Sequence, residues 1–215
     1  MMPGSAENIM ALDGSITSFG LLRHAETVWN RENRIQGHSD LPLAPEGKRK
    51  SRRLGHILAA IPWDRIITSD LNRAVETAKL INFTLNVSIH CDERLREQNW
   101  GRWEGKTIKE IDRLISTKSI ESGWNFRPPG GEDRISVATR SRAALTDAAT
   151  RWPGDTILVV THHGVIRCLM YNLTKRTFLS KNSFPLLRYD YLHFLQHDGY
   201  GLKVVKTNAI GLNLL

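Results

Sequence analysis

The chain has 215 residues and a net charge of +8, and its 40% hydrophobic and 24% charged residues are ordinary for a globular domain. It contains no apolar run that could cross a bilayer and no signal peptide over residues 1–20, which excludes a membrane-embedded protein and favours a cytoplasmic location. Its two cysteines exclude a disulfide framework, and we expect both to be small core residues. We predict a tail over residues 1–15 and a single domain over residues 16–215.

Short apolar runs alternate with segments of helical periodicity. In chain order we predict a strand over residues 16–22, a helix over 46–60, a strand over 65–68, a helix over 71–81, a strand over 87–90, helices over 107–114 and 133–149, a strand over 156–161, a helix over 164–173, and two strands over 191–195 and 202–205 that pair around the turn at 198–199. The continuous apolar run at 157–160, in which three residues are β-branched, is typical of a strand covered on both faces. This order predicts a three-layer α/β domain, in which ligands bind beyond the carboxyl ends of the strands.

Much of the positive charge lies in one segment. Its basic residues are Lys48, Arg49, Lys50, Arg52 and Arg53. Leu54, Ile57 and Leu58 follow them at helical spacing, so we expect the basic residues to form the solvent-exposed face of an amphipathic helix. Substrate steering and nucleic-acid contact are the alternatives, although no basic strand with interleaved aromatic residues supports the second.

Polar side chains follow the first predicted strand. Arg23, His24 and Glu26 come directly after it, and Asn30 follows. A guanidinium holds phosphate with a fixed fork of donors, and a neutral imidazole can attack phosphorus when its other nitrogen is held by a hydrogen bond. Asn30 is a candidate donor to a phosphoryl oxygen. Taken alone, an Arg–His pair at a strand end is more often structural than catalytic.

Two further clusters follow the strands predicted at residues 65–68 and 156–161. Arg73 falls in the first turn of the helix that follows the strand at residues 65–68. There it is either a second phosphate clamp or an exposed helix arginine. His162 and His163 follow the later strand, where a helix begins. The free N–H groups at a helix start favour an anion, so a phosphate site is expected there.

A metal site is the alternative use of these side chains, because His24, Glu26, His162 and His163 are all possible ligands. Adjacent histidines on an extended backbone point to opposite sides, so both rarely bind one ion. The sequence also lacks helical ligand spacing such as H-E-x-x-H. We therefore expect no catalytic metal.

A carboxylic acid is needed to protonate a leaving alcohol, and Glu97 and Glu104 are both candidates on the residues alone. The large side chains around them either shape the leaving-group site or pack in the core or a lid. These side chains are Arg96, Trp100, Trp103, Trp124 and Phe126.

Together the clusters resemble the histidine phosphatase superfamily, also called phosphoglycerate mutase-like. The matching stretches run in the family's order: residues 22–27 with Asn30, 36–43, 68–74 with 77–78, 95–97, 103–105, 129–132 and 162–167. The resemblance implies a doubly wound, mostly parallel α/β fold with helices on both faces of the sheet. It also implies an enzyme that needs no metal and no cofactor.

The resemblance assigns a role to each matching residue. It implies the phosphorylated nucleophile for His24, the proton donor for Glu97, phosphate binding for Arg23, Arg73, His162 and Asn30, and lining of the substrate site for Gln36 and Gly37. The sequence departs from the family at Ala25, where glycine is common, and at His163, where a small residue is usual. The His163 side chain therefore either enters the substrate pocket or turns away from it.

The expected activity is hydrolysis of a small phosphorylated metabolite through a phosphohistidine. A phosphoglycerate mutase is the first alternative. Family mutases usually carry an arginine after the proton donor, a longer insertion with an arginine pair and an extended C-terminal tail. Here Gln98 follows Glu97, the segment to Pro129 is short, the chain ends at Leu215, and residues 103–105 look more like the broad phosphatases and the ribazole phosphatase branch.

A catalytically idle phospho-ligand binding module is the second alternative. It is disfavoured because the nucleophile, the arginines and the carboxylate are all present. We expect no nucleic-acid partner and no membrane partner. The resemblance implies a monomer or a homodimer.

Overall fold

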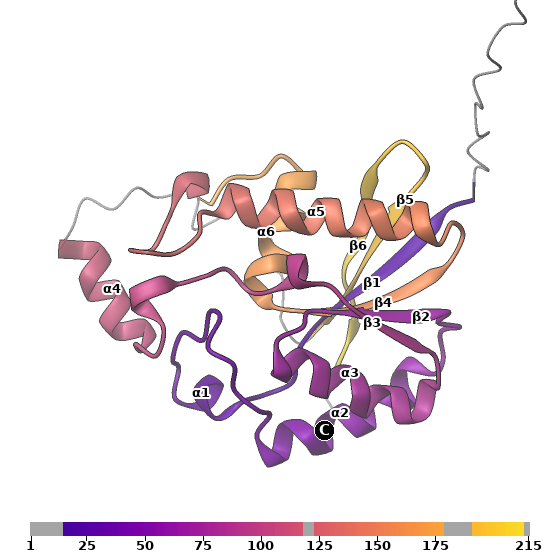
Figure 1. The fold of residues 1–215 in the computed structure, drawn as a ribbon, viewed down its shortest axis with the longest axis horizontal. Helices are drawn as coiled ribbons and strands as arrows, with labels where there is room; N and C mark the ends of the chain where they lie inside the picture. Colours follow the sequence, from indigo (N-terminus) through magenta and orange to yellow (C-terminus); the bar gives the residue numbers. More distant parts are fainter. Residues whose placement is uncertain (1–14, 118–122, 179–190, 213–215) are drawn as a thin grey trace, which may run out of the picture.

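The computed structural model describes residues 15–117, 123–178 and 191–212, which form a six-stranded sheet between two layers of helices (Figure 1). The strands are β1 (Thr17–Arg23), β2 (Arg65–Thr68), β3 (Ser88–Cys91), β4 (Thr156–Thr161), β5 (Tyr191–His197) and β6 (Leu202–Gly211). The helices are α1 (Val28–Arg31), α2 (Pro45–Leu58), α3 (Asn72–Leu85), α4 (Ile108–Thr117), α5 (Arg134–Arg151) and α6 (His163–Leu173), with 3₁₀ turns η1 (Glu93–Leu95), η2 (Gly101–Trp103) and η3 (Gly123–Asn125).

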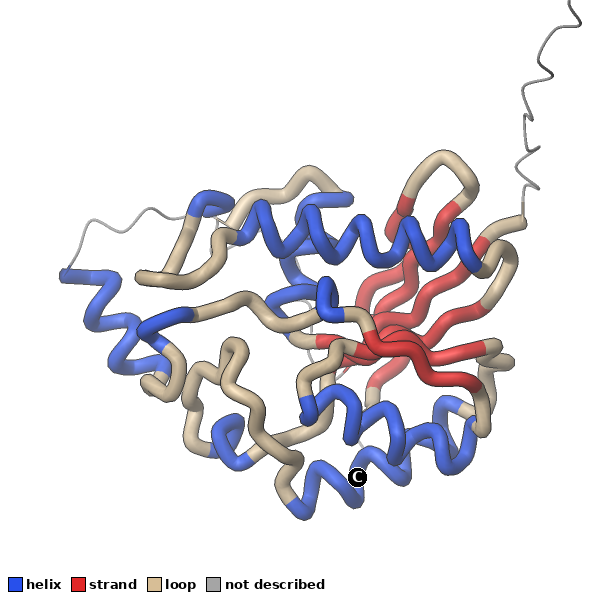
Figure 2. Tube along the Cα trace, in the orientation of Figure 1, coloured by secondary structure: helices blue, strands red, loops and turns tan. Residues whose placement is uncertain are grey.

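The strand order is β3-β2-β4-β1-β5-β6, and Figure 2 shows the strands gathered between the helices. β3, β2, β4 and β1 run parallel to one another. β5 is antiparallel to β1, and β6 is antiparallel to β5. The sheet is thus mostly parallel with helices on both faces, which confirms the expected three-layer, doubly wound α/β fold.

Both faces of the sheet carry a hydrophobic core because side chains alternate along each strand. On β4, Ile157 and Val159 pack into the cluster formed with α5 and α6. Leu158 and Val160 pack into the cluster formed with α2 and α3 on the other face. Figure 1 shows α5 on one side of the sheet and α2 with α3 on the other. The continuous apolar run of β4 follows from this double coverage.

The strand register brings the carboxyl ends of the parallel strands to one edge of the sheet. Arg23 of β1 pairs with Thr161 of β4, and Thr68 of β2 pairs with Val160 of β4 and Cys91 of β3. The segments that follow these strands therefore begin side by side, although they are far apart in the sequence. This edge is where the candidate site lies.

The basic segment forms the outer face of α2, as predicted. Its charged residues are exposed, whereas Gly47, Ser51, Leu54, Gly55 and Leu58 are buried. None of the helices in the described part of the chain is long and apolar enough to cross a membrane.

Several details differ from the predictions. Helix α1 was not predicted, because its four residues are too few to show a helical period and are held by a capping box between Thr27 and Asn30. β6 continues to Gly211 rather than ending at residue 205, since an edge strand can pair without an apolar pattern. Cys168 is buried as expected, but the core assignment of Cys91 is wrong, because this residue is exposed on the edge strand β3.

The expected turn between β5 and β6 is present. The Asp198 carboxylate accepts hydrogen bonds from the backbone N–H groups of Tyr200 and Gly201, each at 3.1 Å, and Gly199 has a φ of +86°. The tail predicted over residues 1–15 lies outside the described residues, apart from Ser15.

Candidate active site

His24 follows β1 and is buried, with 6% of its surface exposed. Its Nδ1 lies 2.7 Å from the carbonyl oxygen of Ala25. A carbonyl can only accept, so Nδ1 carries the proton and Nε2 keeps its lone pair. Burial, with Arg23 and Arg73 close by, holds the pKa of the His24 imidazole well below its ordinary value. The ring is therefore a neutral imidazole with one nitrogen available for attack.

His162 follows β4 and is fully buried. Its ring centroid lies 5.1 Å from that of His24. Its Nε2 is 2.9 Å from Ser69 Oγ, which also accepts from the N–H of Leu71 at 3.3 Å. The hydroxyl hydrogen of Ser69 is then available to Nε2, which places the imidazole proton on Nδ1. That Nδ1 is buried and has no hydrogen-bond partner among the described residues, so it can donate to a ligand.

Arg73 is also fully buried, so the alternative of an exposed helix arginine is wrong. Its guanidinium donates to the carbonyl oxygens of Ser39 at 2.9 Å and Gly37 at 2.6 Å. Its Nε has no partner among the described residues. Burial lowers the pKa of Arg73, but an arginine in a protein stays charged. The result is a fixed, desolvated positive charge at the carboxyl edge of the sheet.

Glu104 stabilises the loop whose carbonyl groups bind Arg73. Its carboxylate accepts from the N–H of His38 at 2.8 Å and from Ser39 Oγ at 2.8 Å. Gly37 has a φ of +51°, and a Cβ at this position would lie 2.1 Å from Glu104 Oε1. Glycine is therefore required where the loop turns over this carboxylate. Glu104 supports the loop through these contacts and does not line the cavity described below.

Glu97 lies in the loop after η1 and does line that cavity. Its carboxylate accepts backbone hydrogen bonds from Gln98 at 2.8 Å and from Gly164 at 3.2 Å. Gly164 belongs to the first turn of α6, where the helix dipole favours a negative group. The structure thus distinguishes the two candidate proton donors, because Glu97 lines the cavity and Glu104 does not. The residue types and their order did not distinguish them.

A cavity of about 670 Å³ lies at this edge of the sheet. Of the predicted site residues, those lining it are Arg23, His24, Asn30, Gln36, Gly37, Arg73, Glu97 and His163. His162 is not among the lining residues, but its ring centroid lies 5.1 Å from that of His24, which does line the cavity. The Asn30 side-chain oxygen is engaged with the N–H of Thr27 at 2.9 Å, so the amide nitrogen is the end available to a ligand.

Sequence reasoning missed most of the outer wall of this cavity. The additional residues include Glu26, Asn33, Arg34, Ile35, Lys50, Leu54, Trp100, Ile108 and Leu212. They come from the loop around α1, from α2, from the start of α4 and from the end of β6. Three of them had a signal in the sequence: Lys50 through the basic cluster, Glu26 through its place after the first strand, and Trp100 as a candidate for the leaving-group site.

Four of the five large side chains proposed for the leaving-group site lie elsewhere. Trp103 and Phe126 are buried in a small cluster beside α4, and Trp124 packs against α5 and α6. Arg96 pairs with Asp70. Trp100 alone of the five lines the cavity.

Among the described residues, no three His, Cys, Asp or Glu side chains are grouped so that they could hold a metal ion. Unused N–H groups remain instead at His162 Nδ1 and Arg73 Nε, close to the Nε2 lone pair of His24. Such a set suits a tetrahedral oxyanion.

Comparisons with known proteins agree with this geometry. The family model of the histidine phosphatase superfamily (branch 1) matches residues 19–210. A curated protein of Yersinia enterocolitica, "Probable phosphoglycerate mutase GpmB", is 35% identical over 156 residues, which are 71% of this chain and 73% of that protein.

Solved structures with the same fold include Bacillus stearothermophilus YhfR, with a TM-score of 0.81 and 33% identity over 91% of this chain and 98% of that one. They also include the mycobacterial glucosyl-3-phosphoglycerate phosphatase Rv2419c, with a TM-score of 0.78 and 25% identity over 91% of this chain and 100% of that one.

The low pKa of His24 predicts that its ring is still neutral at pH 6.5, the ordinary midpoint for a histidine. NMR titration of the imidazole signals measures this directly, and the spectrum of a His24→Gln variant assigns the signal. A titration midpoint at or above pH 6.5 would show that burial does not suppress protonation of the nucleophile.

Gly164→Ala should displace the Glu97 carboxylate, because a Cβ at position 164 would lie 2.2 Å from Glu97 Oε1. A flexible carboxylate can move aside, so we expect a small change in melting temperature. The rate on an alkyl phosphate should fall by about a hundredfold, since general acid help is worth roughly 10²–10⁴-fold. Gly201→Ala is the matched control, because its Cβ would meet nothing within 4 Å. Equal activity of the two variants would exclude a role for Glu97 at its observed position.

Proposed function

Because this chain belongs to the histidine phosphatase superfamily, we propose that it is a phosphomonoester hydrolase that acts on a small phosphorylated metabolite through a phosphohistidine at His24. One observation carries the proposal. The rings of neutral His24 and His162 have centroids 5.1 Å apart, Nδ1 of His162 has no partner in the described part of the chain, and the buried guanidinium of Arg73 is close enough to lower the pKa of both rings.

In the proposed first step, the substrate phosphate binds to Arg23, Arg73, His162 and the amide of Asn30. These donors stabilise the negative charge that the phosphoryl oxygens carry in the transition state. Nε2 of His24 attacks phosphorus in line, and the bond from phosphorus to the leaving oxygen breaks. Glu97 in its protonated form transfers its proton to that oxygen, so the product leaves as an alcohol.

In the second step, water attacks the phosphohistidine and Glu97 takes a proton from it as a general base. The bond from Nε2 to phosphorus breaks, and inorganic phosphate is released. Two displacements at phosphorus replace one difficult displacement. No step requires a metal ion.

A phosphoglycerate mutase is the second candidate, favoured by the name of the curated relative from Yersinia enterocolitica. Gln98 supports the hydrolase instead. It occupies the position after the proton donor, where family mutases usually carry an arginine. Glutamine is uncharged, and this side chain is buried with its amide donating to the carbonyl of Glu132 at 2.7 Å, so it offers a substrate carboxylate neither a charge nor that N–H group.

His24→Ala should abolish hydrolysis of an aryl phosphate while circular dichroism shows an intact fold. Brief incubation with a substrate labelled in its phosphate should give an acid-labile, alkali-stable label on the wild-type protein and none on the variant. His56→Ala, at an exposed histidine on α2, is the control and should behave as wild type. EDTA should leave the rate unchanged. A variant that keeps most of its rate would overturn covalent catalysis by His24, and loss of activity with EDTA would require a metal.

The choice between hydrolase and mutase predicts the products from 3-phosphoglycerate. With the wild-type protein, any turnover should release inorganic phosphate and should not build up 2-phosphoglycerate. Phosphorus NMR distinguishes these products in one sample. Accumulation of 2-phosphoglycerate faster than inorganic phosphate would favour the mutase.

A further inference from the structure

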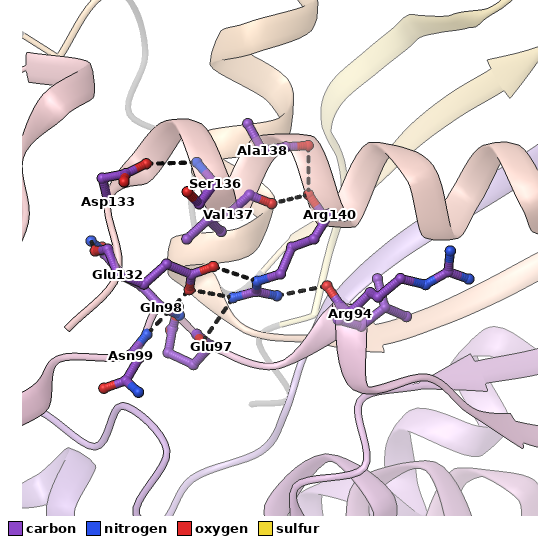
Figure 3. A network of polar contacts seen from close by, with 12 residues as sticks. Arg94, Glu97, Gln98, Asn99, Glu132, Asp133, Ser136, Val137, Ala138 and Arg140 are labelled. Carbon is purple, nitrogen blue, oxygen red and sulfur yellow. Dashed lines mark hydrogen bonds and ion pairs between the residues drawn. The ribbon is translucent and has the colours of Figure 1, made fainter.

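The backbone around Glu97 is held by an arginine that lies outside the cavity (Figure 3). Arg140 extends from the middle of α5. Its Nη2 donates to the Glu97 carbonyl at 3.0 Å, and its Nη1 donates to the Arg94 carbonyl at 2.6 Å. These carbonyls lie in and after η1, at the edge of the sheet, where no β-ladder satisfies them. The guanidinium therefore supplies donors that regular secondary structure would supply elsewhere.

Glu132 fixes the orientation of Arg140. Its carboxylate accepts from Nε at 2.8 Å and from Nη2 at 2.9 Å, which is a bidentate pair with both side chains only about one-fifth exposed. The same residue anchors the loop through its backbone. Its carbonyl accepts from Gln98 Nε2 at 2.7 Å, and its N–H donates to the Asn99 carbonyl at 2.9 Å. One acidic residue thus binds both the arginine and the segment that follows Glu97.

A second contact reaches the Glu97 carbonyl from another segment of the chain. His38 Nε2 lies 2.8 Å from this oxygen and must carry the proton in that contact, because a carbonyl only accepts. The residue that presents the carboxylate to the cavity is thereby held between the loop after α1 and helix α5. None of these contacts involves the Glu97 carboxylate, which lines the cavity and accepts from the backbone N–H groups of Gln98 and Gly164.

We propose that Arg140, oriented by Glu132, is a positioning residue for the proton donor Glu97, an inference that rests on the proposed function. Proton transfer needs the carboxyl group within hydrogen-bond reach of the leaving oxygen. A displacement of about 1 Å in such a group can cost roughly a hundredfold in rate. Arg140 acts by fixing the main chain from which the carboxyl extends.

The leaving-group dependence of the rate separates positioning from a general structural role. A good leaving group such as 2,4-dinitrophenolate departs without protonation, whereas a primary alkoxide requires it. Loss of Glu97 positioning therefore affects kcat/KM for alkyl phosphates and spares it for 2,4-dinitrophenyl phosphate. Damage to the phosphate site or to the fold affects both substrates alike.

The test compares kcat/KM on these two substrates for wild type, Arg140→Met, Arg140→Lys and Glu97→Gln. Arg140→Met should lose at least about tenfold more on the alkyl phosphate than on the aryl one, with the same pattern as Glu97→Gln. The Arg140→Met/Glu97→Gln double variant should lose no more than Glu97→Gln alone, because both changes act through one group. Arg142→Met, at an exposed arginine on the same helix, is the control and should match wild type.

Arg140→Lys keeps the charge but lacks the fork that reaches Glu132, Arg94 and Glu97 together. It should show the same selective loss of kcat/KM on the alkyl phosphate. If Arg140→Met does not fold, Arg140→Lys replaces it in the comparison. Equal losses on both substrates, additive losses in the double variant, or wild-type behaviour of both Arg140 variants would overturn the proposal. All variants should still form the phosphohistidine from 2,4-dinitrophenyl phosphate. Absence of that intermediate in the wild type would instead refute the proposed function.

Discussion

The candidate site depends on a buried charge, the guanidinium of Arg73. Removing an ion from water costs several kcal/mol unless other groups compensate it. Here the carbonyls of Gly37 and Ser39 accept two of its hydrogen bonds, while Nε stays unpartnered among the described residues. The same charge helps to keep His24 and His162 neutral. A phosphate dianion beside Arg73 would compensate this charge and could accept from the Nε–H group that the protein leaves unused.

The strand order makes this arrangement possible. β1, β2 and β4 are parallel neighbours, so the residues that follow them meet at one edge. This meeting of polar residues at one edge of the sheet could be predicted from the sequence, because the apolar run of β4 and the polar residues after each strand can be identified without a structure. The pairing of His24 with His162 and the position of Arg73 follow from that register. The resemblance to a family strengthened the prediction but was not needed to locate the edge.

Other parts of the site could not be predicted from local patterns. Glu97 and Glu104 both lie in loops between short elements, and only the path of the loop at residues 36–39 shows that Glu104 supports it. Arg140 resembles Arg142 in sequence, since both lie on one helix near alanine residues. Their difference appears only when Glu132 and the Glu97 carbonyl come within reach. The outer wall of the cavity draws on α2 and the end of β6, which no spacing rule connects.

The central claim is that a single tetrahedral anion binds between His24, His162 and Arg73. A crystal structure with orthovanadate tests it most directly, because vanadate adopts the geometry of a phosphoryl group in transfer. We expect vanadium bonded to Nε2 of His24, with its oxygens in contact with Nδ1 of His162 and the Arg73 guanidinium. Vanadate bound elsewhere, or bound in this cavity with the His24 ring turned away from vanadium, would contradict the account.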